Sequence, residues 1–374
     1  MRIGIVLYPT FGGSGVLATE LGKALAAKGH EVHFISYNQP ARLDFFSPGI
    51  FYHEVSIPQY PLFEYAPYET ALAGKMVDIV RSAHLELLHV HYAIPHASAA
   101  LMAKAILAQD HIQIPVITTL HGTDITLVGR ESSYEPVVSW SINQSDIVTA
   151  VSQSLKEDTY KHFHVTREIE VVPNFIDFDR FSKKPKDHFK KAISPNGEKV
   201  LVHTSNFRKV KRVGDVLQVF RKVLDQIPAR LLLIGDGPER SHIEGLCRDL
   251  QTCEQVSFLG KQEAVEEILS IGDLFLLPSQ TESFGLAALE AMACEVPVIS
   301  SNAGGLPEVN LDGVTGFLAE VGDIDRMAEK ALYLLQNESE LQTFRAQALA
   351  QAQRFDLANI LIQYETLYQQ AMKR

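Results

Sequence analysis

The sequence has 374 residues, of which 46% are apolar and 21% charged, an ordinary globular composition that excludes a disordered, collagen-like or coiled-coil chain. At roughly 150 residues per domain, this length predicts about two domains. The 34 basic and 45 acidic side chains leave a formal net charge of −11. Such an acidic balance argues against a nucleic acid or a membrane surface as partner, because phosphate groups require a basic face.

Several features of the chain predict a cytoplasmic location. The three cysteines, Cys247, Cys253 and Cys294, are odd in number and widely spaced, which is typical neither of a disulfide framework nor of a zinc site. The apolar run at residues 3–8 is too short for the hydrophobic core of a signal peptide. No window reaches the ~18 consecutive apolar residues of a membrane helix, so stable membrane insertion is not expected.

Short apolar runs alternate with helical patterns along the whole chain. The strands expected in the first half are residues 2–8, 32–36, 87–91, 116–120 and 146–151, with helices at 16–28 and 97–108. The strands expected in the second half are 199–204, 231–235, 255–259, 274–277 and 296–300, with helices near 213–226, 239–250, 263–271, 285–294, 323–336 and 339–353. Strands that are separated by crossover helices predict an α/β fold with parallel sheets covered on both faces.

Two Rossmann-like domains are expected, residues 1–172 and residues 173–356. The stretch 173–198, rich in Lys, Pro and Asp, is predicted to be the linker between them. The amphipathic helix at 357–374 is expected to fold back on the first domain. Because open α/β sheets bind ligands at the carboxyl ends of their strands, an interdomain cleft is the expected site.

A glycine-rich turn, Gly12 to Gly15, follows the first expected strand and opens a helix. Read from Gly13, it fits the dinucleotide fingerprint G-x-G-x-x-A. However, the second strand ends at residues 35–38 without the acid that holds a ribose, which disfavours NAD. The remaining interpretation is an anion at the positive end of a helix, and the alternative is a tight turn that needs glycine for its dihedral angles.

Histidines lie within or just after two of the expected strands. His121 lies just past a strand end, where an imidazole can donate to a substrate hydroxyl or act as a base, the alternative being a hydrogen bond to a neighbouring loop. His89, His91 and His96 form a second group without a carboxylate at ligand spacing. They are interpreted as structural or substrate-lining, and no metal site is expected.

Four basic side chains follow the first strand of the second half, namely Arg208, Lys209, Lys211 and Arg212. Cations at the N-terminus of a helix oppose the helix dipole, so this cluster predicts a bound anion that resolves the conflict. The alternative is a solvated basic start of a helix.

Two glutamates flank the start of an apolar helix in the second half. Ser283 is expected to cap a helix that begins near Phe284, which places Glu282 at the strand end. Glu290 lies among apolar residues, where a carboxylate is costly without a polar partner. A pair of ligand hydroxyls would supply that partner, and the alternative is a surface Glu–Lys pair. The D-x-D pairs at 177–179 and 323–325 are expected to be turn and cap aspartates.

These motifs together resemble the retaining glycosyltransferases of family 4, which have the two-domain GT-B fold. The resemblance spans the whole chain. Its motifs in the second half are the E-x7-E pair Glu282 and Glu290, Gly235-Asp236-Gly237-Pro238-Glu239, and residues 173–177, 303–308 and 312–317. It implies sugar transfer from a nucleotide sugar on one face of the sugar ring, with the leaving diphosphate as base and with neither a cofactor nor an essential divalent metal.

Within the family, the first half resembles members that transfer GlcNAc from UDP-GlcNAc to the hydroxyl of L-malate, the first step of bacillithiol biosynthesis. The motifs concerned are residues 8–15, 88–96 and 118–124. The resemblance implies an acceptor-binding first domain, a UDP-sugar-binding second domain and a homo-oligomer. The alternatives are a lipid or polysaccharide acceptor, an epimerase or phosphorylase of the same fold, and a non-catalytic nucleotide-sugar binder.

The resemblance also implies roles for individual residues. Lys211 and Arg208 would stabilise the diphosphate, with Asn206 standing where the family has an arginine, and His121 would contact the 6-hydroxyl end of the sugar. Glu290 would bind the ribose and Glu282 the sugar. The implied catalytic residues are therefore His121, Arg208, Lys211 and Glu282. The implied donor-binding residues are Gly13, Asn206, Arg208, Lys211, Ser283, Phe284, Gly285, Leu286 and Glu290. The implied acceptor-binding residues are Ser14, Gly15, Tyr92 and Thr119.

Overall fold

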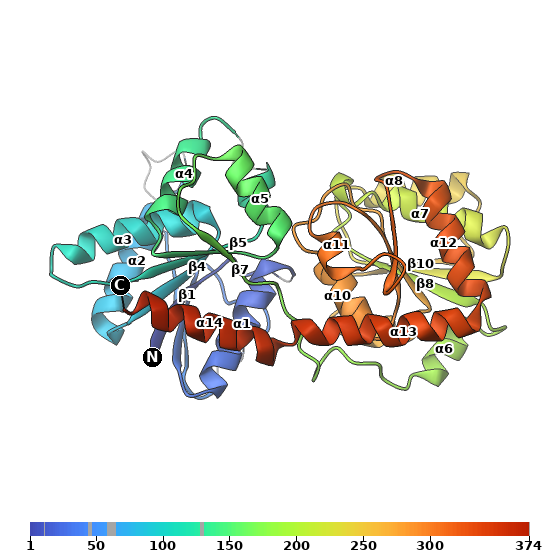
Figure 1. Ribbon diagram of the computed structural model, residues 1–374, viewed down its shortest axis with the longest axis horizontal. Coiled ribbons are helices and arrows are strands. Elements are labelled where there is room, and N and C mark those ends of the chain that lie inside the picture. The colour runs from blue at the N-terminus through green and yellow to red at the C-terminus, as the bar shows by residue number, and fades with distance from the viewer. Residues whose placement is uncertain (11, 44–46, 58–64, 128–130, 374) are drawn as a thin grey trace. The chain divides into compact units, whose positions relative to one another are not determined.

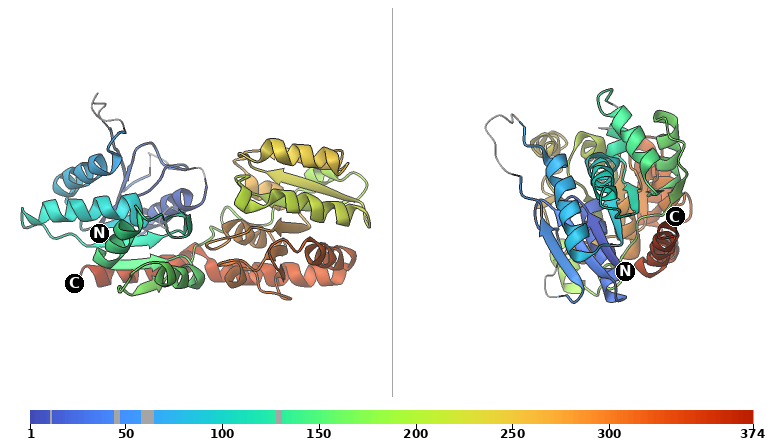
Figure 2. Two further views of the ribbon diagram at one scale, coloured as in Figure 1. Left: turned by 90° about the horizontal axis from the view of Figure 1, so that it is seen from above. Right: turned by 90° about the vertical axis from the view of Figure 1, so that its left-hand side faces the viewer.

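The computed structural model describes residues 1–10, 12–43, 47–57, 65–127 and 131–373. The chain divides into two compact units, Met1–Asn174 together with Leu357–Arg374, and Phe175–Asp356. Each unit is a parallel sheet with helices on both faces (Figure 1 and Figure 2). This is the α/β architecture that the alternating strand and helix patterns predict.

The sheet of the first unit has the strand order β3-β2-β1-β4-β5-β6-β7. Its strands are β1 (Arg2–Val6), β2 (Glu31–Ser36), β3 (Ile50–Glu54), β4 (Leu87–His91), β5 (Val116–Leu120), β6 (Ile147–Ala150) and β7 (Ile169–Val171). Its helices are α1 (Ser14–Ala27), α2 (Tyr68–Ala83), α3 (Ser98–Ala108), α4 (Glu135–Gln144), α5 (Gln153–His162) and α14 (Leu357–Ala371), with π-helical turns η1 (Ala93–Ala97) and η2 (Thr123–Leu127). The central strands β4 and β5 are buried on both faces, and their sequences are mainly branched side chains, with His89 and His91 as the exceptions in β4.

The C-terminal helix α14 packs on the first unit, as the sequence predicts. Its Tyr368 is fully buried, and the Tyr368 hydroxyl lies 2.8 Å from Nδ1 of His89 in β4. On the same helix, Glu365 forms ion pairs with Lys28 at 2.8 Å and with His30 at 3.2 Å. A buried aromatic ring and two polar contacts therefore join the end of the chain to its beginning.

The sheet of the second unit has the order β10-β9-β8-β11-β12-β13. Its strands are β8 (Lys199–Thr204), β9 (Ala229–Ile234), β10 (Val256–Gly260), β11 (Leu274–Leu277), β12 (Val298–Ser301) and β13 (Gly316–Ala319). Its helices are α6 (Asp187–Ile193), α7 (Val213–Leu224), α8 (Arg240–Asp249), α9 (Val265–Leu269), α10 (Leu286–Ala293), α11 (Leu306–Val309), α12 (Ile324–Gln336) and α13 (Glu338–Ala352), with 3-10 turns η4 (Lys209–Lys211) and η5 (Gln353–Phe355). Its core lies between the sheet, α7 and α12, where Phe220 is fully buried.

The expected linker is wrong over residues 175–198, because these residues belong to the second unit. They contain α6, and three of their lysines form ion pairs with acidic residues of that unit. Lys190 Nζ lies 2.7 Å from Asp273 Oδ1, and Lys183 Nζ lies 3.1 Å from Glu295 Oε2. The polar composition of this stretch therefore led to the wrong prediction of a linker. Its basic residues instead pair with acidic residues that lie far away in the sequence.

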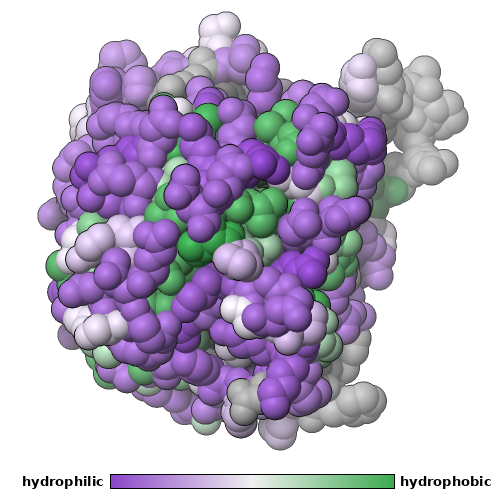
Figure 3. Space-filling model, turned by 90° about the vertical axis from the view of Figure 1, so that its right-hand side faces the viewer, coloured by the Kyte–Doolittle hydropathy of each residue, from purple (hydrophilic) through white to green (hydrophobic). Residues whose placement is uncertain are grey.

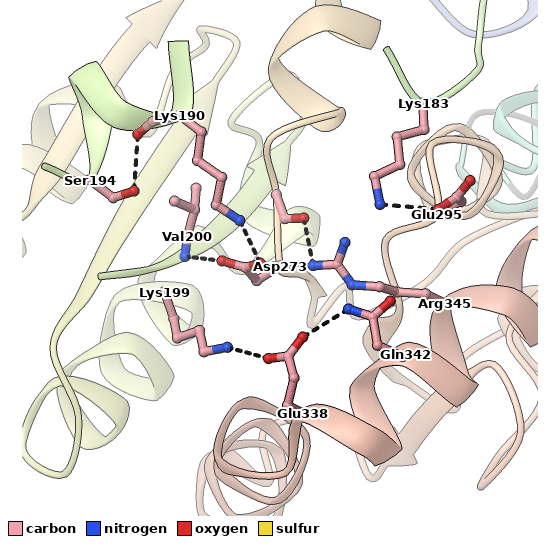
Figure 4. Close-up of polar contacts among 11 residues, drawn as sticks. Lys183, Lys190, Ser194, Lys199, Val200, Asp273, Glu295, Glu338, Gln342 and Arg345 are labelled. Carbon is pink, nitrogen blue, oxygen red and sulfur yellow. Dashed lines mark hydrogen bonds and ion pairs between the residues drawn. The ribbon is translucent and has the colours of Figure 1, made fainter. Parts of the chain in front are cut away.

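Asp273 is the centre of a buried ion cluster in the second unit (Figure 4). The residue precedes β11 and is only 4% exposed. Its carboxylate accepts hydrogen bonds from Lys190 of α6 at 2.7 Å, from Arg345 of α13 at 2.7 Å and from the Val200 N–H of β8 at 2.8 Å. One carboxylate thus connects four elements at the amino ends of the central strands.

The face shown in Figure 3 is mainly hydrophilic, with a hydrophobic area near its centre. The second unit also exposes large apolar side chains, including Phe189, Val314, Val321 and Tyr333. Exposed apolar residues of this kind are ordinary in globular proteins. Within the described part of the chain, helices of membrane-spanning length and hydropathy are absent.

Candidate functional site

Each sheet has one point at which the strand order reverses, between β1 and β4 in the first unit and between β8 and β11 in the second. In open α/β sheets, ligands bind at the carboxyl ends of the strands beside such a point. The loops that follow these four strands carry most of the predicted site residues. The two units therefore each present a candidate binding region, and the two regions are built differently.

In the second unit, the loops after β8 and β11 are joined by an ion pair. Lys211 Nζ lies 2.5 Å from Glu282 Oε1, and Ser279 Oγ donates to the same oxygen at 2.9 Å. The backbone N–H of Gln280 also donates to the Val210 carbonyl at 2.8 Å. Both charged side chains keep some exposed surface, 22% for Lys211 and 13% for Glu282, so a polar ligand can reach them.

Glycines allow the backbones around this ion pair to approach closely. A Cβ on Gly237 would lie 2.0 Å from the Asn206 carbonyl oxygen, and one on Gly304 would lie 2.0 Å from the Glu282 carbonyl oxygen. Real Cβ contacts of that length do not occur, so neither site accepts a larger residue without movement. The neighbouring Gly305 N–H donates to the same Glu282 carbonyl at 2.9 Å. The glycines of both sequence motifs therefore hold the loops that carry Asn206 and Glu282.

The expected start of α10 is wrong. The helix begins at Leu286, and its N-cap is Gly285 in a left-handed conformation, with φ of 102° and no side-chain cap. Ser283 therefore lies in the loop and does not cap the helix. Phe284 is buried against Phe355, with ring centroids 5.5 Å apart, so only its backbone is available to a ligand. The positive end of the helix dipole, with its first-turn N–H groups, lies next to Glu282.

The remaining donor-site candidates surround this helix start. Glu290 is partly buried and lies four residues after Leu286, hence on the same face of α10. Asn206 and Arg208 are exposed in the loop after β8. Of the basic cluster, Arg212 pairs with Asp215 at 2.6 Å in the first turn of α7. That pair supplies the negative charge that the helix N-terminus favours. Of the other three cations, Arg208 and Lys209 are exposed, and Lys211 is paired with Glu282.

In the first unit, the turn between β1 and α1 needs its glycines. Gly13 has φ of 60°, and a Cβ on Gly15 would lie 2.3 Å from the Tyr8 carbonyl oxygen. Ser14, the first residue of α1, places its Oγ 2.5 Å from the Tyr92 hydroxyl, which joins the loops after β1 and β4. Phe11, a residue of the same motif, lies outside the described residues.

Three histidines of the first unit, His91, His96 and His121, are connected by hydrogen bonds at the ends of β4 and β5. Nδ1 of His91 lies 2.8 Å from Nε2 of His121, and Nδ1 of His96 donates to the His91 carbonyl. Burial lowers the pKa of His121 to about 3 and that of His96 to about 4. These imidazoles are neutral at physiological pH, so His121 acts there as a hydrogen-bonding group and not as a cation.

Thr119, an expected acceptor contact, lies inside the sheet. It has no exposed surface, and its hydroxyl lies 2.7 Å from Nε2 of His89 and 2.7 Å from the Thr149 hydroxyl. The structure therefore places Thr119 beneath the candidate site, where it orients His89, and not at a surface that an acceptor could contact.

Asp124 is a candidate to which the sequence motif alone assigned no role. It is 3% exposed, and its carboxylate accepts hydrogen bonds from the Ala93 N–H at 2.8 Å and from the Gly122 N–H at 3.1 Å. Burial raises the pKa of Asp124 to about 6, an effect that the backbone N–H groups partly oppose. The only sequence signal for this residue was its place two positions after the glycine that follows His121.

The two D-x-D pairs have the structural roles that were expected. Asp177 Oδ1 accepts a hydrogen bond from the Asp179 N–H at 3.0 Å, which is an Asx turn. Asp323 caps α12 by accepting from the Arg326 N–H at 3.0 Å. In the described ranges of the chain, no three His, Cys, Asp or Glu side chains gather as metal ligands would.

Comparisons with known proteins match both halves of the chain. Residues 11–180 match the model of Glycosyltransferase Family 4, and residues 184–351 match that of Glycosyl transferases group 1. The N-acetyl-alpha-D-glucosaminyl L-malate synthase of Bacillus anthracis is 46% identical over 375 residues, an alignment that covers 100% of this chain and 98% of the relative.

Solved structures show the same fold at lower sequence identity. The Anabaena protein HepE, solved with UDP and glucose, superposes with a TM-score of 0.82 at 22% identity and covers 98% of this chain and 99% of its own. Sucrose-phosphate synthase from Thermosynechococcus elongatus gives 0.80 at 20% identity, covering 99% and 98%. Together with the full-length relative, these matches show that the chain belongs to the family-4 glycosyltransferases and has the GT-B fold.

Proposed function

We propose that this glycosyltransferase transfers GlcNAc from UDP-GlcNAc to the hydroxyl group of L-malate, the first step of bacillithiol biosynthesis. The observation that carries the proposal is the 46% identity, over the full length of the chain, to a synthase whose name states the sugar and the acceptor. The two candidate binding regions support it, because one offers groups for a nucleotide sugar and the other offers groups for an anionic acceptor.

The second unit would bind the donor. Lys211 and Arg208 supply positive charge for the diphosphate, and Asn206 lies in the same loop. Glu290 would accept hydrogen bonds from the ribose hydroxyls. Glu282 would accept them from the sugar, next to the N–H groups of residues 283–286 at the start of α10.

The first unit would bind malate. Helix α1 is 14 residues long, and the N–H groups of Ser14 and Gly15 lie at its positive end, where a carboxylate is favoured. The Tyr92 hydroxyl, 2.5 Å from Ser14 Oγ, would add a donor beside them. Neutral His121 would contact the 6-hydroxyl end of the sugar, and Gly13 would let the donor diphosphate approach the loop.

The proposed reaction needs little proton chemistry from the protein. The bond between the sugar C1 and the diphosphate oxygen breaks, and a bond from C1 to the malate oxygen forms on the same face. The malate proton passes to the leaving diphosphate oxygen, so no carboxylate pair of the glycosidase kind is required. The contribution of the protein is then to position both substrates and to stabilise the charge that develops on the diphosphate.

The test of this function is UDP release from UDP-GlcNAc with and without L-malate. Glycerol phosphate and inositol phosphate serve as control acceptors, and a lipid acceptor tests the alternative acceptor class. The aromatic residues at 60–80 are the stretch considered for a lipid, and two of them, Tyr60 and Phe63, lie outside the described residues. We expect stimulation by malate alone. Turnover that does not depend on malate would leave the family assignment intact and discard this acceptor.

Replacing Glu290 with alanine is expected to raise the KM for UDP-GlcNAc at least about tenfold with a smaller effect on kcat. Loss of hydrogen bonds to a charged acceptor costs about 1.5–3 kcal/mol, and about 1.4 kcal/mol corresponds to a factor of ten. Glu295→Ala is the matched control, because Glu295 pairs with Lys183 outside the loops of the candidate site. An unchanged KM for UDP-GlcNAc in Glu290→Ala would exclude ribose binding by this residue.

The location and the assembly of the protein form a separate part of the proposal. Cys247, Cys253 and Cys294 are all free thiols, which supports a reducing compartment such as the cytoplasm. A homo-oligomer is proposed from the family resemblance. Light scattering coupled to size-exclusion chromatography measures the molar mass directly, and a value near 41.6 kDa would contradict the oligomer.

A further inference from the structure

We propose that Asp124 is a positioning residue that holds together the two loops carrying Tyr92 and His121. Its two carboxylate oxygens bind one N–H group from each loop, Ala93 after β4 and Gly122 after β5. Ala93 directly follows Tyr92, and Gly122 directly follows His121. The structural role of Asp124 does not depend on the proposed function, whereas its expected effect on kcat rests on that function.

The backbone next to the Ala93 attachment point is held in an unusual conformation. Tyr92 has φ of 86°, which a bulky side chain rarely adopts, whereas the φ of 112° at Gly122 is ordinary for glycine. The conformation of Tyr92 persists only where surrounding contacts hold it in place. The hydrogen bond from the adjacent Ala93 N–H to Asp124 is a contact of that kind. The rings of Tyr92 and His121 consequently lie 5.2 Å apart at their centroids.

Protonation of Asp124 would weaken this clamp. An ionised carboxylate accepts at both oxygens, whereas the protonated acid has one oxygen that carries a hydrogen and accepts poorly. With a pKa raised by burial to about 6, Asp124 is ionised at pH 8 and largely protonated at pH 5. We therefore expect Asp124, which belongs to the loop after β5, to hold the Ala93 N–H of the other loop and the Gly122 N–H of its own loop less firmly as the pH falls through 6.

The neighbouring groups keep their charge state over that pH range. Burial raises the pKa values of Tyr8 and Tyr92, the tyrosines whose charge would interact with Asp124, to about 12. The pKa values of His121 and His96 lie at about 3 and 4. Helix α5 packs against η2 and buries Leu155 and Thr159, which do not titrate, whereas its ionisable residues Lys156, Glu157, Asp158, Lys161 and His162 are exposed or partly exposed. A transition near pH 6 that is present in the wild type and absent in Asp124→Asn is therefore assigned to Asp124.

The clamp can be tested without any substrate. In protein labelled with 15N at alanine and glycine, the amide protons of Ala93 and Gly122 are followed by NMR between pH 5 and pH 8. We expect both resonances to titrate together near pH 6 in the wild type and to stay constant in Asp124→Asn. Resonances that do not move in the folded wild type overturn the proposal, even if the variant fails to fold.

The catalytic consequence is tested by malate-dependent UDP release. We expect kcat of the wild type to fall with the same midpoint as the amide titration. Asp124→Asn should have kcat at least about tenfold lower at pH 8 and no transition near pH 6, because displaced reacting groups lose rate steeply. Asp78→Asn on the surface of α2 is the matched control and should behave as wild type.

The amide titration tests the clamp, and the turnover assay tests the proposed acceptor, so one proposal can fail without the other. Amide titration without malate-dependent turnover would retain the clamp and discard the proposed acceptor. Malate-dependent turnover with a wild-type pH profile in Asp124→Asn would retain the function and overturn the clamp.

Discussion

Replacing Lys211 with alanine is expected to lower kcat by about 100- to 1,000-fold, the range seen when one group that stabilises transition-state charge is removed. The Lys211 ammonium lies at the switch point of the second sheet, 2.5 Å from Glu282. Negative charge on the leaving diphosphate grows as the sugar bond breaks. A cation placed beside it lowers the barrier more than it strengthens binding of the ground state.

The KM for UDP-GlcNAc should therefore change much less than kcat in Lys211→Ala. Lys209→Ala is the matched control, because Lys209 lies in the same 3-10 turn and is exposed. Its kcat should stay within a factor of two or so of wild type, since Lys209 is exposed to solvent and the family resemblance assigns the diphosphate to Lys211 and Arg208 instead. Steady-state measurements with varied UDP-GlcNAc separate the two parameters. A normal kcat in Lys211→Ala would remove this residue from the proposed mechanism.

Replacing Asp273 with alanine is expected to lower the free energy of unfolding of the second unit by about 3–5 kcal/mol. The substitution leaves the Arg345 guanidinium buried, at 7% exposure, without its carboxylate 2.7 Å away. It also removes the acceptor of Lys190 and of the Val200 N–H (Figure 4). An uncompensated buried charge accounts for most of the loss.

The change is measured by urea unfolding, with Asp325→Ala as the matched control. Asp325 pairs with Lys222 at 2.8 Å, but its side chain is 87% exposed, so its loss should cost less than about 1 kcal/mol. The double variant Asp273→Ala with Arg345→Leu should recover part of the stability, because the unpaired charge is then absent. Equal destabilisation by the Asp273 and Asp325 substitutions would contradict the account of the buried cluster.

The strands that sequence patterns predicted well are the central, doubly buried ones. β4 and β5 occur at residues 87–91 and 116–120, as their short runs of mainly branched residues indicated. The edge strand β3 (Ile50–Glu54) was missed, because its mixture of aromatic, histidine and acidic residues has no clear hydrophobic period. β7 (Ile169–Val171) was missed because three residues are too few to show one.

The start of α10 and the linker at residues 175–198 were predicted wrongly for other physical reasons. Ser283 resembles an N-cap, but Gly285 can adopt a left-handed conformation that places the helix start two residues further on. Residues 175–198 have the composition of a linker, whereas Asp273 and Glu295 neutralise their lysines from about 80 to 110 residues away. Neither effect is visible in a local window.

The sequence by itself determined the α/β class, the family through its spaced glycines and glutamates, and most candidate residues, because local periodicity and motif spacing are properties of the chain alone. Only the tertiary structure decided which side chains meet. Strand order brought Lys211 to Glu282 and Ser14 to Tyr92 across two switch points. The tertiary structure also buries Asp124, in the loop after β5, against the loop after β4. This burial raises the pKa of Asp124 to about 6. Distances and burial of this kind arise from contacts between residues far apart in the chain, so no local pattern records them.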